Sequence, residues 1–335
     1  MSVKRIGEKL SKRVDPYVLA ILLMVVLASV LPCRGTAAVV AGYVTDFAIA
    51  LLFFLYGARL PRETVVEGLT HWRLQAAVLA GTFVLFPLLG LATSALVQPV
   101  LGSSLSLGVL FLCLLPSTVQ SSIAFTSIAR GNVAAALCSA SISNLLGVLL
   151  TPILVGLVMK TQQGGFSFDA VKDVAFQLLV PFVAGQLLRP WLKGFMTKWK
   201  SLLGYVDRGA ILLVVYTAFS HGVVNGIWHQ LAPSGLVLLL IVNLILLAVV
   251  LTIMTVASRA MGFSKEDEIA IVFCGSKKSL ASGIPIANVL FPAQTVGLIV
   301  LPLMLFHQVQ LMACAALARR YAARPDVPTA AVASR

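Results

Sequence analysis

Residues 268–291 read EIAIVFCGSKKSLASGIPIANVLF, an apolar segment of membrane-spanning length with a polar centre at residues 275–279. Residues 107–132 have the same design: they read LGVLFLCLLPSTVQSSIAFTSIARGN, with a polar centre at residues 116–122 that begins with proline. Proline removes a backbone hydrogen bond, and hydroxyl or amide side chains can satisfy the backbone groups that are freed. Both segments are therefore predicted to be discontinuous helices buried within a bundle.

The rest of the chain has the composition of an integral membrane protein. Of its 335 residues, 59% are hydrophobic and only 11% are charged, whereas soluble domains are about a quarter charged. Apolar runs long enough to cross a hydrocarbon core of about 30 Å recur along the sequence. They predict an all-α protein with ten transmembrane helices at 17–31, 37–60, 72–97, 105–129, 133–159, 171–189, 210–224, 236–257, 269–290 and 296–318.

The two interrupted segments are the fourth and ninth of these helices, so they occupy corresponding positions in two halves of five helices each. An odd number of spans inverts the second copy, and this pattern is typical of transporters built from inverted repeats, in which the broken helices cross near the bilayer midplane. The predicted organisation is a first repeat at 1–160, an inverted second repeat at 161–318, and a disordered cytoplasmic tail at 319–335. The plainer reading of the hydroxyl side chains is that they serve only helix packing.

The net charge of +13 follows the predicted loops. Of the 25 Lys and Arg residues, Arg34, Lys160 and Lys172 fall on one side, Lys277 and Lys278 lie within a span, and the others gather on the opposite side. The positive-inside rule then places both termini in the cytoplasm. The basic excess is explained by orientation and contact with anionic membrane lipids, so no nucleic-acid partner is expected. The five scattered cysteines indicate neither a disulfide framework nor a metal site.

Three ionisable residues fall inside predicted helices: Asp46, Lys277 and Lys278. Each costs roughly 2.5–3.5 kcal/mol at the bilayer centre, so such residues are functional candidates by default. At about 1.5 Å per residue, Asp46 and Lys277 have similar depths, so Asp46 and one of the lysines are candidates for an ion pair, either functional or purely structural; depth alone does not give the direction of either side chain. The lysines themselves are candidates for a proton carrier, or for a fixed ammonium that replaces a bound sodium ion and leaves a cationic pocket for an anion.

Further candidate site residues are polar side chains at and around the two breaks. Ser141 and Asn144 share one face of the fifth helix, and Thr82 lies on the third. His221 and His307 are interpreted as packed residues or as residues at a cavity mouth. The candidates within the breaks themselves are Gln120, Ser121, Ser122, Ser276 and Ser279.

Three segments carry a family resemblance: residues 53–60 (FFLYGARL), residues 116–132, and residues 273–280 (FCGSKKSL). There the chain resembles the bile acid:sodium symporter superfamily (solute carrier family 10), in its branch of bacterial proteins similar to the orphan seventh human member. The resemblance implies a bacterial inner-membrane transporter with a panel domain of helices 1, 2, 6 and 7. It also implies a core domain of helices 3–5 and 8–10, crossed helices 4 and 9, and transport by alternating access.

The same resemblance implies sodium ligands at Ser121, Ser122 and Asn144, with a further one near Thr82. It also shows two departures: the family's sodium-binding glutamate falls on Phe273, and its Gln-Asn pair falls on Lys277 and Lys278. These replacements remove oxygen ligands that sodium prefers. The expected substrate is a small organic anion, with sodium, proton or exchange coupling left open and no other cofactor.

Other classes of function fit the sequence less well. An anion channel usually shows rings of charge or a repeated filter. An intramembrane Ser-Lys hydrolase is conceivable near the buried lysines, but the chain has neither a His-Glu-x-x-His motif nor a Gly-x-Ser-x-Gly elbow. A regulator of ion homeostasis without transport of its own is a third alternative. We expect a transporter, not an enzyme; the oligomeric state is left open.

Overall fold

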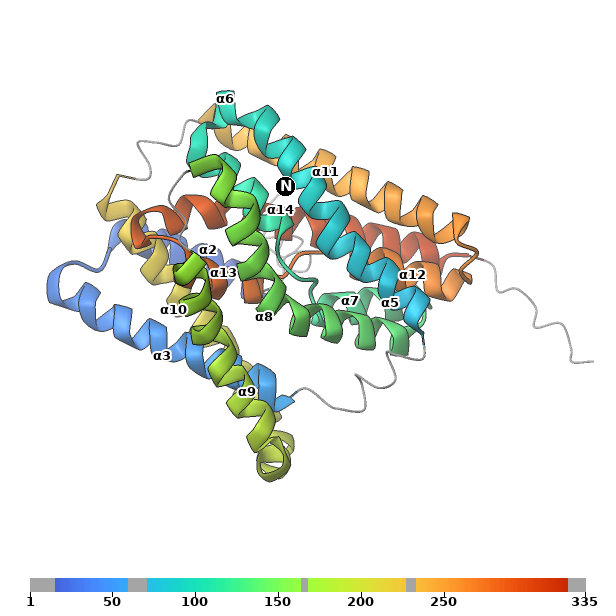
Figure 1. Ribbon diagram of the computed structural model, residues 1–335, viewed down its shortest axis with the longest axis horizontal. Coiled ribbons are helices and arrows are strands. Elements are labelled where there is room, and N and C mark those ends of the chain that lie inside the picture. The colour runs from blue at the N-terminus through green and yellow to red at the C-terminus, as the bar shows by residue number, and fades with distance from the viewer. Residues whose placement is uncertain (1–15, 60–70, 164–167, 227–232, 325–335) are drawn as a thin grey trace, which may run out of the picture.

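The computed structural model describes residues 16–59, 71–163, 168–226 and 233–324, and within these ranges every regular element is a helix (Figure 1). The first half contains α2 (Pro16–Val30), α3 (Gly35–Arg59), α5 (Trp72–Ala80), a π-helical turn η1 (Gly81–Leu85), α6 (Phe86–Cys113), α7 (Gln120–Ile128) and α8 (Val133–Gln163). The second half contains α9 (Phe168–Lys198), α10 (Lys200–Val224), α11 (Pro233–Ala260), α12 (Lys265–Gly275), α13 (Leu280–Leu290) and α14 (Ala293–Ala322).

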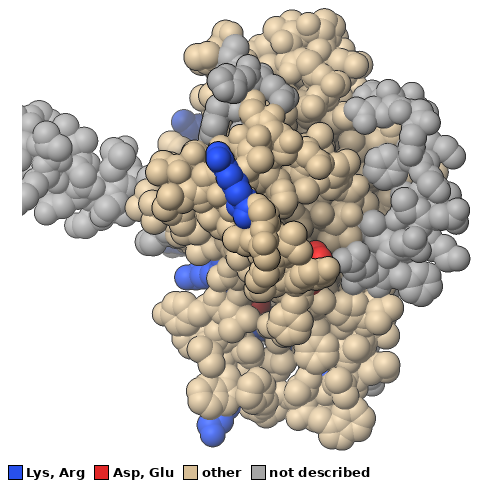
Figure 2. Space-filling view, turned by 90° about the vertical axis from the view of Figure 1, so that its left-hand side faces the viewer, with Lys and Arg blue, Asp and Glu red and all other residues tan. Residues whose placement is uncertain are grey.

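Seven helical stretches among the described residues are long and apolar enough to span a membrane, and Leu19–Val30 is a shorter apolar helix. One of the seven, Trp72–Cys113, has 42 residues and would be about 63 Å long if straight, twice the hydrocarbon thickness. Gly102 interrupts it with φ 74° and ψ 174°, between the predicted third and fourth spans. Uncharged side chains also dominate the face shown in Figure 2, as a lipid-facing surface requires. The chain is therefore an all-α integral membrane protein.

The helices extend beyond the predicted apolar runs. The ninth predicted span starts at 269, but α12 begins at Lys265, because Ser264 caps it by accepting from the Asp267 N–H and the first turn is acidic. At the other end of the chain, α14 continues to Ala322, so the predicted disordered tail starts as helix. Residues 325–335 lie outside the described part of the chain.

Two glycines bring α3 and α9 into backbone contact. A Cβ atom on Gly57 would lie 1.9 Å from the Phe182 carbonyl oxygen, and one on Gly185 would lie 2.0 Å from that of Phe54. Small residues allow this close approach in membranes, where van der Waals packing drives helix association. The glycine of the FFLYGARL segment thus belongs to a helix-packing contact.

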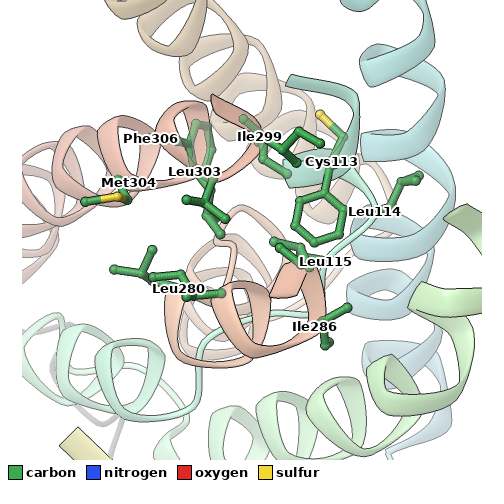
Figure 3. Packing of buried hydrophobic residues seen from close by; sticks show 14 of the residues in the cluster. Cys113, Leu114, Leu115, Leu280, Ile286, Ile299, Leu303, Met304 and Phe306 are labelled. Carbon is green, nitrogen blue, oxygen red and sulfur yellow. The ribbon is translucent and has the colours of Figure 1, made fainter. Parts of the chain in front are cut away.

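Both predicted breaks are present. The first separates α6 from α7 at residues 114–119, and the second separates α12 from α13 at residues 276–279. The stretch Lys265–Leu290 is 94% buried over its most apolar window, against 28% for Gly35–Arg59, so the second broken helix is interior as predicted. Figure 3 shows Leu115, from the first break, packed near Leu280 and Ile286 of α13.

Candidate functional site

The two helix breaks touch each other through hydrogen bonds. The Ser279 N–H donates to the Pro116 carbonyl at 2.9 Å. In return, the hydroxyl of Ser117 donates to the Cys274 carbonyl at 2.5 Å, and that of Ser122 to the Phe273 carbonyl at 3.0 Å. These hydroxyls satisfy backbone groups that the breaks release, which is the role the sequence predicts for them.

Helix α8 supports the two breaks from one side. Ser143 accepts from the Ser117 N–H at 3.1 Å, and Thr151 donates to the Leu114 carbonyl at 2.9 Å. Asn144, a predicted site residue, accepts from the Ser282 hydroxyl at 2.8 Å. Its neighbour on the same face, Ser141, is half-buried. The polar face of α8 therefore holds both breaks in place.

Lys278 is fully buried, and its ammonium is enclosed by backbone oxygens. Nζ donates to the carbonyls of Thr82 at 2.9 Å, Cys113 at 2.9 Å and Leu115 at 2.7 Å. It also lies 4.1 Å from the ring centroid of Phe86. All three donors of the ammonium are thus used.

Lys277 is equally buried but has a different environment. Its ammonium lies over the rings of Phe125 (4.4 Å) and Phe273 (5.4 Å). The hydroxyl oxygen of Ser121 lies 3.5 Å from the Lys277 Nζ. Adjacent lysines that the sequence could not distinguish therefore differ sharply: one ammonium is fully hydrogen-bonded, and the other is held mainly by aromatic faces.

Gln310 on α14 is a site residue that sequence reasoning missed. Its Oε1 accepts from the Lys278 N–H at 2.9 Å, and its Nε2 donates to the Lys278 carbonyl at 3.0 Å. His307, one turn away, places Nδ1 2.9 Å from the same Nε2. An amide within the apolar run 296–318 was the signal that could have identified it.

A cavity of about 490 Å³ lies beside the two breaks. The α2, α3 and α10 helices form one wall with Tyr17, Tyr56, Arg59, Gly204, Asp207, Arg208 and Ile211. The other wall comes from the broken helices, α8 and α14, and includes Thr118, Gln120, Ser121, Phe125, Asn144, Ser279, Ser282 and His307. The ammonium of Lys277 contacts two of these lining side chains, Ser121 and Phe125, so its charge lies close to the cavity.

The charged side chains that line the cavity come from α3 and α10. Arg59 forms a short ion pair with Asp207, joining α3 to α10. The guanidinium of Arg208 lies 5.6 Å from the ring centroid of Tyr17. With two arginines and one aspartate, this wall has a net positive charge.

Other predicted site residues have local roles. The Thr82 hydroxyl donates to the Val78 carbonyl at 2.8 Å, so only its backbone oxygen contacts Lys278. The Ser276 hydroxyl similarly donates to the Val272 carbonyl at 2.5 Å. Ser121 lies 2.6 Å from the hydroxyl of Thr118. These bonds fix backbone conformation around the breaks.

The expected pairing of Asp46 with a lysine is wrong. Asp46 is exposed on α3, and the described ion pairs do not include it, while Lys278 uses all its donors on carbonyls. Residue counting gives the depth of a side chain but not its direction around the helix axis. Asp46 is also not among the residues that line the cavity beside the breaks.

The position that the resemblance associates with sodium is apolar here. Phe273 packs against the rings of Phe125 (6.0 Å) and Tyr321 (6.1 Å), in a cluster with Ile269 and Cys314. Ser121 and Ser122 are near, but Asn144 is bonded to Ser282, and a lysine ammonium occupies the nearby carbonyls. The described residues contain no group of three His, Cys, Asp or Glu side chains suited to a metal ion. At this position Phe273 supplies no oxygen ligand for a sodium ion.

A bundle of apolar helices with two touching helix breaks beside a polar cavity has the features of a polytopic membrane transporter. The chain belongs to the SBF-like CPA transporter family, whose family model matches residues 15–323. It is 52% identical over 317 residues to the putative symporter YfeH of Escherichia coli, covering 93% of this chain and 94% of that protein. An uncharacterized protein of Pseudomonas aeruginosa is 56% identical, covering 95% and 96% of the two chains.

More distant relatives are animal proteins. Sodium/bile acid cotransporter 7-B of Xenopus laevis is 27% identical, covering 91% of this chain and 90% of its own. Sodium/bile acid cotransporter 7 of Rattus norvegicus is 28% identical, covering 80% of each chain. The family and these relatives are transporters and not enzymes, which removes the Ser-Lys hydrolase from consideration.

Proposed function

We propose that the protein is a secondary active transporter that moves a small organic anion across the bacterial inner membrane by alternating access. The observation that carries the proposal is the cavity of about 490 Å³, whose two walls come from different helix groups and which reaches Ser121 at the helix crossing. Relative movement of the two walls would close the cavity on one side and open it on the other.

The charges around the cavity support an anionic substrate. Arg59 and Arg208 line it with Asp207 as the opposing charge, and the ammonium of Lys277 lies behind its polar wall. A buried cation without a carboxylate partner favours an anion that approaches it, because the attraction is little screened in a site of low dielectric. Hydroxyl and amide groups, including Ser121 and Asn144, would then orient the substrate.

The proposed membrane topology has ten spans in two inverted repeats, with boundaries at 160 and 318. Two observations support this topology. Both predicted breaks are present, and the long stretch Trp72–Cys113 is divided at Gly102. Hydrogen bonds join Arg73 to Met261, Asn132 to Asp267 and Arg324 to Glu266, so loop ends predicted to be cytoplasmic meet at one end of the molecule. This end is assigned to the cytoplasm by its basic residues.

Proton coupling or exchange is favoured over sodium coupling. Animal relatives are named sodium/bile acid cotransporters, but here aromatic and cationic side chains take the places of the expected sodium ligands. Lys277 is the candidate proton carrier, since its ammonium lies near the cavity and has few partners. The alternative of an ion-homeostasis regulator without transport predicts no solute flux by the purified protein.

The test is uptake by the purified full-length protein in liposomes, offered labelled acetate, lactate, succinate, citrate and taurocholate, with choline and lysine as cationic controls. Ser121→Leu introduces bulk into the cavity, whereas Ser127→Leu makes the same change on an exposed position of α7 outside it. An anion is expected to accumulate with the wild type and Ser127→Leu but not with Ser121→Leu or empty liposomes. Flux confined to cations, flux unchanged by Ser121→Leu, or no flux of any solute would contradict the proposal.

A further inference from the structure

The three carbonyls around Lys278 have the arrangement of a cation-binding site. They come from three separate places: the π-helical turn η1 supplies Thr82, the end of α6 supplies Cys113, and the first break supplies Leu115. Helix ends and interruptions leave carbonyl oxygens without intrahelical partners, and the C-terminal end of a helix carries partial negative charge. Such oxygens suit a hard monovalent cation.

We propose that the Lys278 ammonium is a built-in cation that occupies this carbonyl site, and that removal of its side chain opens the site to Na⁺ or a small alkylammonium ion. The proposal rests on the transport function and deepens it. A transporter that carries its own cation at the helix crossing needs no dissolved sodium ion there to stabilise the crossing.

The contacts match an ammonium one to one. Three N–H donors meet three carbonyl oxygens at 2.7–2.9 Å, and the face of Phe86 covers a further side at 4.1 Å. None of these partners is a carboxylate, so the cation is stabilised by dipoles and not by an opposite charge. The site would therefore accept another monovalent cation that is small enough to fit between these oxygens.

The backbone of Lys278 is fixed independently of its side chain. Gln310 binds both its N–H and its carbonyl, and the side chain has no exposed surface. Truncating the side chain is thus expected to leave the carbonyls in place around an enclosed space.

The adjacent lysine provides a matched control. Lys277 is equally buried and carries the same charge, but its ammonium contacts aromatic rings and one hydroxyl instead of carbonyls. Its removal opens no carbonyl site, so it controls for the general effect of deleting a buried lysine at the crossing.

The experiment compares thermal unfolding of full-length wild type, Lys278→Ala and Lys277→Ala in detergent, in chloride salts of sodium, methylammonium and choline at equal ionic strength. Choline is too large for the site. We expect sodium or methylammonium to raise the Tm of Lys278→Ala by at least about 3 °C over choline. No such rise is expected for the wild type or Lys277→Ala. An equal response in all three proteins, or none in Lys278→Ala, would overturn the proposal.

Lys278→Gln covers the case in which Lys278→Ala does not fold. Its shorter, neutral side chain leaves room for a small cation, and the same salt dependence is expected; its absence would equally overturn the proposal. The unfolding readout does not require transport, so failure of the proposed function and failure of this inference are distinguishable. In proteoliposomes, wild-type anion uptake is expected to be unchanged when choline replaces sodium.

Discussion

Gln310 binds Lys278 through both main-chain groups, accepting from its N–H at 2.9 Å and donating to its carbonyl at 3.0 Å. This is the pairing that a neighbouring helical turn would otherwise supply, and it comes instead from a side chain on α14. The non-helical backbone of the second break is thereby held in place inside the bundle.

Replacing this amide with a hydrocarbon is expected to destabilise the protein. Gln310→Leu leaves two buried main-chain groups unpaired, at about 1–3 kcal/mol for each. Guanidinium or SDS unfolding followed by circular dichroism would measure the loss. Met312→Leu, at an exposed position of the same helix, is the control and is expected to change stability little. Equal stability of the two variants would show that Gln310 does not support the break.

The two buried lysines are expected to respond oppositely to neutral replacement. Lys277→Met removes a charge held mainly by aromatic rings, which relieves a desolvation cost, so its Tm is expected to rise while anion uptake falls about tenfold or more. Lys278→Met leaves three carbonyls without a donor, so its Tm is expected to fall. Both variants are measured by thermal unfolding and by anion uptake into liposomes. Equal changes of Tm and of uptake in the two variants would refute the assignment of different roles.

Close packing of α3 on α9 makes Gly57 intolerant of any side chain. A Cβ atom there would lie 1.9 Å from the Phe182 carbonyl oxygen, so Gly57→Ala forces the helices apart and is expected to cost about 1–3 kcal/mol. Gly42→Ala is the matched control on the same helix, because nothing lies within 4 Å of its added methyl group. The Tm of each purified variant measures the difference, and a tolerated Gly57→Ala would contradict the observed contact.

Glu268 connects three helices at one end of the molecule. Although buried, it accepts hydrogen bonds from Arg259 at 3.1 Å, Lys265 at 2.7 Å and the Tyr321 hydroxyl at 2.9 Å. Glu268→Leu removes their shared acceptor and is expected to cost about 1–3 kcal/mol, mostly because the buried Tyr321 hydroxyl loses its partner while the two cations stay solvated.

The neighbouring Glu266 provides the comparison for this network. Its carboxylate is about half exposed and pairs with Arg324, so Glu266→Gln is expected to change stability by less than about 1 kcal/mol. The two variants can be compared by the same unfolding measurement. A larger loss for Glu266→Gln than for Glu268→Leu would contradict the importance of burial here.

Asp46 tests the corrected site. Because its side chain is exposed on α3 and outside the cavity, Asp46→Asn is expected to leave anion uptake within about twofold of the wild type. Arg59→Gln, which removes the cavity-lining partner of Asp207, is the contrasting variant and is expected to lower uptake. A larger loss of anion uptake in Asp46→Asn than in Arg59→Gln would place Asp46 in the transport site.

The amino-acid sequence alone determined that the protein is helical, lies in the membrane and is interrupted at two places. These properties are local: apolar length sets the spans, while Pro116 and the polar run around Lys277 do not suit a continuous lipid-facing helix. The hydroxyls at both breaks could also be assigned to backbone satisfaction, since released carbonyls inside a bilayer must find donors.

Only the tertiary structure decided which groups surround each buried lysine. Lys277 and Lys278 are neighbours in sequence, yet one ammonium lies among aromatic rings and the other among carbonyls from residues 82, 113 and 115. For the same reason, Asp46 is exposed although it was a candidate site residue, and Gln310 binds the second break although the sequence analysis did not single it out. The direction of a side chain around its helix, and the partners that other helices bring to it, depend on how distant segments pack, which residue counting along one segment does not contain.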